Sequence, residues 1–245
     1  MGKSKAPVSA SLKHPLQRFE SPSRAISFSI HAFGLCSFYG SFWYMINFPT
    51  AMNEAYGWHY QYLTIIGLLV STITFGFGLL ADITLSHSLF AVKNSLSLWC
   101  APLEVLITIL YWTISAIDRE LVIPPEINLD PYADISFHLM PSLLLVLDLL
   151  LLSPPYTIKN LPAATLSTVM AFTYWAWIEH CYTKNGFYPY PLFDILSTTH
   201  RAGLFGASAL LMTGSTILLR WLYGKVNGSL ETGNKRTTPA NIKGE

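Results

Sequence analysis

The sequence comprises 245 residues, of which 51% are apolar and only 12% are Asp, Glu, Lys or Arg. A soluble globular domain carries about twice this share of charged residues, so most of the chain does not need a hydrated surface. The formal net charge of +1 gives no sign of the basic face that an extended nucleic-acid interface requires. Together with a mean hydropathy of +0.39, these values exclude an ordinary soluble domain and favour an integral membrane protein.

Long apolar segments follow one another along the chain with short gaps between them. A helix needs about 20 apolar residues to cross the roughly 30 Å hydrocarbon core, and its backbone groups must be hydrogen-bonded within the segment. The sequence therefore predicts an all-α polytopic membrane helix bundle with six transmembrane helices. The predicted spans are residues 27–47, 61–83, 96–117, 134–152, 161–182 and 202–223. They form a transmembrane domain over residues 25–224, between polar tails at residues 1–24 and 225–245.

Basic residues are distributed unequally between the two predicted sides of the membrane. One side, made of the tails and the second and fourth loops, holds Lys3, Lys5, Lys13, Arg18, Arg24, Lys93, Lys159, Arg220, Lys225, Lys235, Arg236 and Lys243. The other side holds only Arg119, Lys184 and Arg201. The positive-inside rule therefore predicts that both termini are cytoplasmic. The first apolar segment begins only after residue 24 without a clear cleavage site, which argues against a removable signal peptide. Short tails without a recognisable address favour the endoplasmic reticulum or another endomembrane.

Polar side chains gather at one predicted depth, near the non-cytoplasmic surface. Thr64 and His138 each lie about one turn into an inward-running span, roughly 5–6 Å below that surface. Ionisable groups at this depth usually face the bundle interior or a cavity. The inner half of the bundle offers only Asp82 and Asp148, and the pattern shows no titratable partner for His31. The side chains that form a supporting polar cluster in this prediction are Asp118, Arg119, Glu120, Asp148, Glu179, His180 and His200.

A hydroxyl and an imidazole at equal depth on separate helices have the chemistry of a nucleophile and its base. The simpler interpretation of Thr64 is a hydrogen bond to the backbone carbonyl one turn earlier. The charged triplet at residues 118–120 is most simply an interfacial ion cluster. His138, His180, His200 and Glu179 are suitable zinc ligands, but no HxxxH or HExxH spacing places two of them on one helix face. We therefore expect no metal and no other cofactor.

The same residues belong to motifs that resemble the androgen-induced protein family. The matching segments are YGWHYQYLT at 56–64, FGFGLLAD at 75–82, WTISAIDRELVIP at 112–124, YWAWIEH at 174–180 and GFYPY at 186–190. His138, followed by an apolar run with Asp148 ten positions later, completes the ordered set. The sequence departs from the family pattern at Trp58, Tyr60, Gln61 and Leu139-Met140, around both Thr64 and His138.

The resemblance implies a multi-pass membrane hydrolase that cleaves fatty acid esters of hydroxy fatty acids, with a membrane lipid as substrate. It implies that Thr64 is the nucleophile and His138 its partner. Two other hypotheses remain open at this point. A transporter or lipid-binding protein would have a polar route that continues from the Thr64 layer to Asp148. A non-catalytic scaffold would have a filled bundle with no pocket near Thr64.

Overall fold

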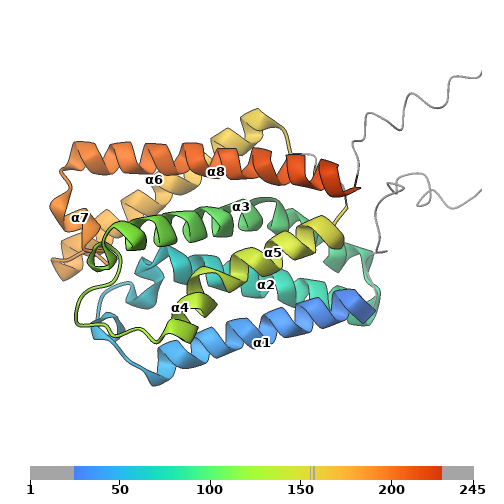
Figure 1. Cartoon of the computed structure of the whole chain (residues 1–245), viewed down its shortest axis with the longest axis horizontal. Coiled ribbons are helices and arrows are strands. Elements are labelled where there is room, and N and C mark those ends of the chain that lie inside the picture. Colours follow the sequence, from blue (N-terminus) through green and yellow to red (C-terminus); the bar gives the residue numbers. More distant parts are fainter. Residues whose placement is uncertain (1–24, 155, 157, 228–245) are drawn as a thin grey trace, which may run out of the picture.

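The computed structural model describes residues 25–154, 156 and 158–227, and in this part of the chain all regular structure is helical (Figure 1). The predicted tails, apart from residues 225–227, lie outside the described residues. The longer helices are α1 (Ala25–Asn47), α2 (Leu63–Thr84), α3 (His87–Ile117), α4 (Pro131–His138), α5 (Met140–Leu151), α6 (Asn160–Asn185) and α8 (Thr198–Asn227). The short elements are η2 (Ala51–Asn53), η3 (Trp58–Gln61), η4 (Arg119–Leu121) and α7 (Leu192–Ile195).

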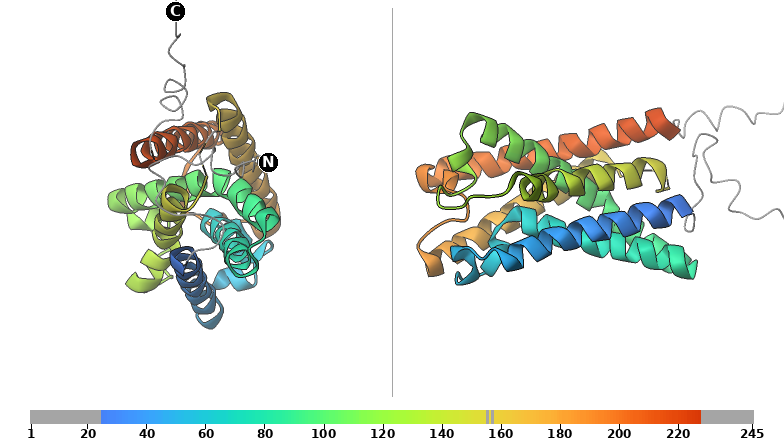
Figure 2. Two further views of the ribbon diagram at one scale, coloured as in Figure 1. Left: turned by 90° about the vertical axis from the view of Figure 1, so that its right-hand side faces the viewer. Right: turned by 60° about the horizontal axis from the view of Figure 1, so that its bottom comes forward.

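The long helices run along one common direction and form a polytopic bundle (Figures 1 and 2). α3 packs against α2, α5 and α8, whereas α6 packs chiefly against α8. The segments that are long and apolar enough to cross a membrane are α1, α2, α3, the α4–α5 pair over Pro131–Leu151, and α8. The prediction of six spans is thus confirmed for five segments. α6 has 26 residues, enough for about 39 Å, but its Ser, Thr, Tyr and Trp residues make it less apolar.

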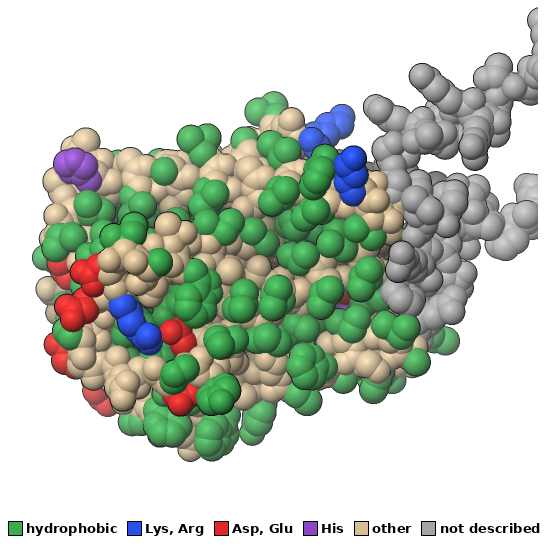
Figure 3. Space-filling view, viewed as in Figure 1, with side chains coloured by type: hydrophobic (Ala, Val, Ile, Leu, Met, Phe, Trp, Pro, Cys, Tyr) green, Lys and Arg blue, Asp and Glu red, His purple; other side chains and the backbone are tan. Residues whose placement is uncertain are grey.

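The bundle has two chemically different ends. Ala25 begins α1 and Asn227 ends α8 at the same end, on the right in Figure 1. We call this the terminal end. At the opposite end, on the left, α1, α3 and α6 finish and α2, α4 and α8 begin. We call it the polar end, because the Asp and Glu side chains visible in Figure 3 gather toward it.

The predicted fourth span is divided into α4 and α5 at Leu139, whose backbone leaves the helical region with φ −126° and ψ −45°. Pro141 lies in the first turn of α5, where its missing N–H costs least. The Thr108 hydroxyl of α3 donates to the His138 carbonyl at 2.7 Å, so this carbonyl is satisfied at the break. The break makes His138 the last residue of a short helix.

α3 begins at His87, nine residues before the start that the apolar pattern predicts, and its first turn is capped by Ser86. This start brings Lys93 into the helix with its side chain completely buried. The assignment of Lys93 to a cytoplasmic loop is therefore wrong. The ammonium lies 2.5 Å from Asp148 Oδ2, and it also donates to Ser153.

A buried ionic network, consisting of His31, Asp82, Lys93 and Asp148, connects α1, α2, α3 and α5. The His31 ring bridges the two carboxylates, with Nδ1 2.6 Å from Asp82 and Nε2 3.1 Å from Asp148. The expectation that His31 has no titratable partner is therefore wrong. Gly78 permits the close approach of α2 to this ring, because a Cβ there would lie 2.5 Å from His31 Nε2.

Candidate functional site

Thr64 is the second residue of α2 and is only 7% exposed. The other hydroxyls of α2 that donate to the carbonyl four residues earlier belong to Ser71, Thr72, Thr74 and Thr84. At Thr64 the corresponding carbonyl, that of Tyr60, accepts instead from the Trp177 indole at 2.9 Å. The Thr64 side chain faces the phenol of Tyr190. The simple interpretation of Thr64 as a helix-bonded hydroxyl is therefore not what the structure shows.

Tyr190 connects the start of α2 to the loop before α7. Its hydroxyl oxygen accepts from the Leu63 N–H at 3.1 Å, one of the amide groups that a helix start leaves without an intrahelical partner. Burial raises the pKa of Tyr190 above its usual value, so the phenol stays protonated at neutral pH. Thr64 thus lies beside a protonated phenol at the positive end of a helix dipole.

His138 is held from two directions. Its Nδ1 lies 2.8 Å from Asp134 Oδ1, one turn earlier on α4, and Asp134 in turn pairs with Arg119 at 3.2 Å. The Tyr111 ring of α3 stacks on the imidazole with centroids 3.4 Å apart and an interplanar angle of 3°. A carboxylate at Nδ1 favours the tautomer with the proton on Nδ1, which leaves the Nε2 lone pair available. The ring is fixed in orientation and is prepared to accept a proton.

Two cavities meet at Thr64. The first, of about 640 Å³, lies between α2, α3, α6 and α8 and is lined almost entirely by apolar side chains. The second, of about 750 Å³, lies beneath the loops of the polar end and is lined by both Thr64 and His138. Thr64, Tyr111 and Tyr190 line both cavities. The structure thus brings the predicted hydroxyl and imidazole into one hollow, without a direct hydrogen bond between these two described residues.

The remaining predicted cluster residues divide into separate groups. Arg119 reaches the site through Asp134, whereas Asp118 caps η4 by accepting from the Glu120 N–H at 3.0 Å. Asp148 does not join this layer, because it pairs with Lys93 and His31 in the buried ionic network. The prediction that Asp148 belongs to the polar cluster around Thr64 is therefore wrong.

The polar residues of α6 and α8 form contacts of their own. Glu179 pairs with Arg201 at 3.3 Å and accepts from the Tyr188 hydroxyl at 3.0 Å. Burial raises the pKa of Tyr188 to about 12. His180 contacts the Tyr56 hydroxyl at 3.2 Å, and the described His, Cys, Asp and Glu residues form no group of three that could hold a metal ion.

His200 is exposed at the start of α8. Its Nδ1 lies 2.7 Å from the Ser197 hydroxyl, so its partner differs from those of the other predicted residues.

Sequence reasoning missed Asp134, Tyr111, Tyr190 and His59 at the site. Asp134 had a usable signal, because its spacing of four from His138 puts both side chains on one helix face. His59 lines the second cavity and contacts Asn53 at 3.1 Å, and burial lowers its pKa, which favours the neutral imidazole. The aromatic residues gave no signal of this kind, since interface anchoring explains a tyrosine near a membrane surface equally well.

Comparison with known proteins confirms the resemblance described from the sequence motifs. The model of the FAR-17a/AIG1-like protein family matches residues 26–224. The UPF0641 membrane protein PJ4664.05 of Schizosaccharomyces pombe is 34% identical over 206 residues, which cover 83% of this chain and 92% of that protein. No solved structure matches the chain. The chain is therefore a multi-pass membrane protein and belongs to the FAR-17a/AIG1-like protein family.

Proposed function

We propose that this protein is an intramembrane lipid-ester hydrolase in which Thr64 is the nucleophile and His138 its base. The observation that carries the proposal is the shared cavity, lined by the Thr64 hydroxyl and by an imidazole that Asp134 and Tyr111 hold in place. The family resemblance supports the same two residues and implies fatty acid esters of hydroxy fatty acids as the substrate class.

The reaction follows the logic of an activated hydroxyl nucleophile. His138 Nε2 takes the Thr64 proton while the hydroxyl oxygen attacks the ester carbonyl, and Asp134 stabilises the resulting imidazolium. The same imidazolium then gives its proton to the leaving alcohol, which leaves an acyl-threonine that water cleaves. The mechanism requires Thr64 and His138 to come into hydrogen-bond contact once substrate is bound, and catalytic hydrogen bonds are often long in unliganded enzymes.

Tyr111 is the group best suited to stabilise the oxyanion. Its side chain is 6% exposed and lines both cavities, and its hydroxyl lies near the Asp134 carboxylate and the Ser115 hydroxyl. The phenol O–H is therefore a donor within the cavities that Thr64 lines, and a bound ligand can accept from it. A carbonyl oxygen bound beside Thr64 would accept this hydrogen bond, and the bond would strengthen as negative charge develops.

The two cavities suit an ester with two hydrocarbon chains, one on each side of the carbonyl.

The two cavities also help to decide between the enzyme, the transporter and the scaffold. Neither cavity is lined by Asp82 or Asp148, so the polar route toward the terminal end that a transporter requires has no support from them. A scaffold needs no hollow at Thr64. The presence of cavities at Thr64 and the lining of these cavities without Asp82 or Asp148 both favour the enzyme over the two alternatives.

We further propose that α6 is the sixth transmembrane helix and that both termini are cytoplasmic. An even number of crossings agrees with Ala25 and Asn227 at one end of the bundle (Figure 1). Lys159, Arg220 and Lys225 at or near the terminal end agree with a cytoplasmic location even after Lys93 is removed from the count. An endomembrane, such as the endoplasmic reticulum, remains our proposed location.

Covalent labelling tests the nucleophile directly. A fluorophosphonate probe is expected to label the purified protein and not the Thr64→Ala variant, because the probe captures only an activated hydroxyl. In-gel fluorescence and mass spectrometry of the labelled peptide give the readout. Thr72→Ala is the matched control, since Thr72 lies on the same helix and donates to Leu68 O. Equal labelling of the Thr64→Ala variant would reject Thr64 as the labelled residue.

Asp134→Asn is expected to lower kcat by up to roughly 10⁴-fold, because an amide does not stabilise the imidazolium and favours the wrong tautomer. Steady-state kinetics across a pH series measure the effect, and a positioning role also predicts a shift of the pH profile. The matched control is Asp130→Asn, since Asp130 caps the start of the same helix and asparagine caps equally well. An unchanged pH profile and kcat in Asp134→Asn would remove Asp134 from the mechanism.

A further inference from the structure

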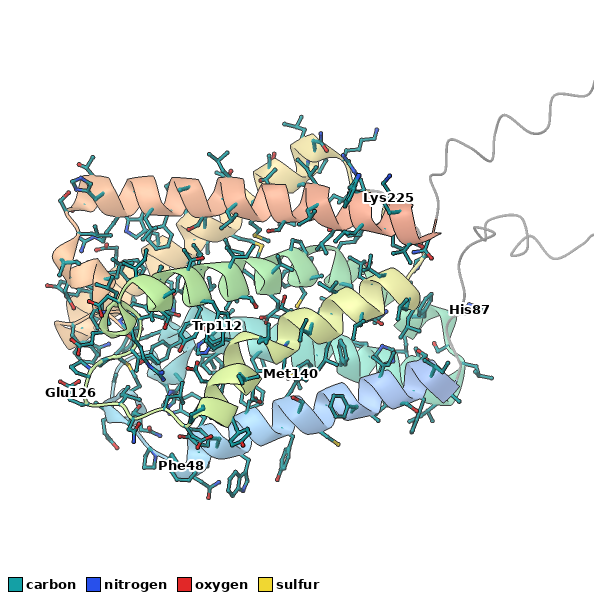
Figure 4. All side chains as sticks on the ribbon, in the orientation of Figure 1. Phe48, His87, Trp112, Glu126, Met140 and Lys225 are labelled. Carbon is teal, nitrogen blue, oxygen red and sulfur yellow. The ribbon has the colours of Figure 1, made fainter. Side chains whose placement is uncertain are left out.

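The proposed mechanism gives no role to Glu104, a buried acidic residue of α3. Its side chain is 1% exposed and lines neither of the two cavities. Figure 4 labels His87 and Trp112 toward opposite ends of α3, and Glu104 lies between them along the helix. An ionisable residue inside a membrane bundle is energetically expensive, and its presence usually indicates a function.

Glu104 reaches α2 through a chain of hydrogen bonds. The Ser71 hydroxyl lies 2.8 Å from the Gly67 carbonyl oxygen and 2.9 Å from Glu104 Oε1. A serine hydroxyl has a single proton to donate, and a carbonyl oxygen can only accept. When Ser71 donates to the Gly67 carbonyl, the hydrogen bond between Ser71 and Glu104 takes its proton from the carboxyl group.

The surroundings of Glu104 also favour a neutral carboxyl group. The ion pairs among the described residues do not include Glu104. An ionised Glu104 would be a buried charge without a cation beside it, and such a group becomes neutral instead. As a carboxylic acid, Glu104 donates to Ser71, and Ser71 donates to Gly67. Two hydrogen bonds in series thus connect α3 to the backbone of α2.

The same contact determines how α2 and α3 align. A Cβ atom on Gly67 would lie 2.5 Å from Glu104 Oε1 and 2.8 Å from the Ile107 side chain, so the two helices approach closely here. The helices run in opposite directions (Figure 1), which brings Thr64 of α2 level with Ile107 of α3. Each lies three residues nearer the polar end than the contact. Tyr111 lies about one turn beyond Ile107, so the contact sets the height of Thr64 relative to the Tyr111 phenol.

Apolar packing alone gives such an alignment little support, because lipid tails are as apolar as leucine side chains. Small residues and polar contacts between membrane helices provide the specificity. We infer that Glu104, as a neutral carboxylic acid, is a positioning residue that holds Thr64 in place for reaction beside Tyr111. This inference rests on the proposed function and adds a residue to it.

Glu104→Leu fills a similar volume without a donor, and kcat is expected to fall about 10- to 100-fold, because a misplacement of about 1 Å can cost 10²-fold. KM should stay within about twofold, since only the alignment of the reacting groups changes. Glu104→Gln should retain kcat within about threefold, because its amide N–H can donate to Ser71. Hydrolysis of a long-chain ester by purified protein in micelles gives both constants.

Two further variants show whether the hydrogen-bonded chain causes the effect. Ser71→Ala removes its central hydroxyl and should lower kcat as much as Glu104→Leu does. The double variant should be no slower than either, because both changes break the same chain. Thr74→Ala is the matched control, since Thr74 is also completely buried on α2 and donates to the Val70 carbonyl of its own helix at 2.8 Å. Its kcat should equal that of the native protein, and thermal unfolding midpoints show that all variants are folded.

Infrared difference spectroscopy tests the proton on Glu104 without turnover. The spectrum of the native protein minus that of Glu104→Gln is expected to show the carbonyl band of a protonated carboxylic acid at neutral pH. The band should shift in Ser71→Ala, because the acid loses its hydrogen-bond acceptor.

The outcomes separate this inference from the proposed function. An active native protein whose Glu104→Leu variant keeps its kcat would overturn the inference alone. A Glu104→Gln variant as slow as Glu104→Leu, or a carboxylate band in place of the acid band, would also overturn it. A native protein that hydrolyses no long-chain ester would contradict the proposed hydrolase, and the positioning role with it.

Discussion

Thr64→Val is expected to abolish ester hydrolysis, with kcat reduced roughly 10⁴- to 10⁶-fold, as for other hydroxyl nucleophiles that act together with a base. Valine preserves the volume and branching of threonine and removes only the hydroxyl, so the side chain still fills the same buried position. Hydrolysis of a long-chain ester by purified protein in micelles measures the loss. The thermal unfolding midpoint of the same samples shows that the fold is intact.

Thr64→Ser is the informative companion variant, because it retains the hydroxyl and should retain measurable turnover. His138→Ala is expected to be as inactive as Thr64→Val, and the double variant should be no worse than either, because the two groups act as a unit. Full activity of purified Thr64→Val would contradict the proposed mechanism, whatever the other variants do.

Lys93→Met is expected to destabilise the protein by about 3–5 kcal/mol, because removing one partner of a buried ion pair leaves an uncompensated charge. Lys93 and Asp148 are both completely buried, 2.5 Å apart. The His31 ring would then be the remaining basic side chain beside Asp148 in the buried ionic network. Reversible unfolding in mixed micelles with increasing sodium dodecyl sulfate measures the change in free energy.

The double variant Lys93→Met with Asp148→Leu is expected to recover most of the lost stability, because replacing both members of a buried pair by apolar groups is often neutral or better. Lys225→Met serves as the surface control and should change the free energy of unfolding by less than about 0.5 kcal/mol. Lys225 is exposed near the end of α8, where it lies over the Trp221 ring. A Lys93→Met protein as stable as the native one would show that the pair contributes no net stability.

The sequence was sufficient to predict the common depth of Thr64 and His138, but not that the two residues line one cavity. Alternating spans bring the start of every second span to one end, so residues one turn into them share a layer. The structure places both residues at the polar end and in one cavity. The break at Leu139 agrees with the position of Pro141 two residues later, because a proline inside a predicted span suggests a helix start or a kink.

The sequence pattern could not show which side chains of different helices contact one another. Hydropathy alone could not place Lys93 inside α3, since its ammonium is compensated by a carboxylate 55 residues later in the chain. The bridging role of His31 likewise depends on how α1, α2 and α5 rotate about their axes. α6 is a contrasting case, because the sequence predicts a span over residues 161–182 and the structure has a helix of 26 residues there, although its polar and aromatic residues make it less apolar than the other spans.

The ion pairs and hydrogen bonds between helices also determine where the bundle can open to an incoming lipid. Ionic contacts bind the terminal-end halves of α1, α2, α3 and α5 into a rigid base. Tyr223 and Asn227, at the end of α8, donate to carbonyls of Ser153 and Leu150 and anchor α8 to that base. At the polar end, α6 is held to the segment before α2, because the Tyr174 hydroxyl donates to the Gln61 carbonyl at 2.7 Å and the Trp177 indole donates to the Tyr60 carbonyl at 2.9 Å. α8 is therefore held at the terminal end and α6 at the polar end, so any opening of the bundle between α6 and α2 beside Thr64 has to break the two polar-end hydrogen bonds.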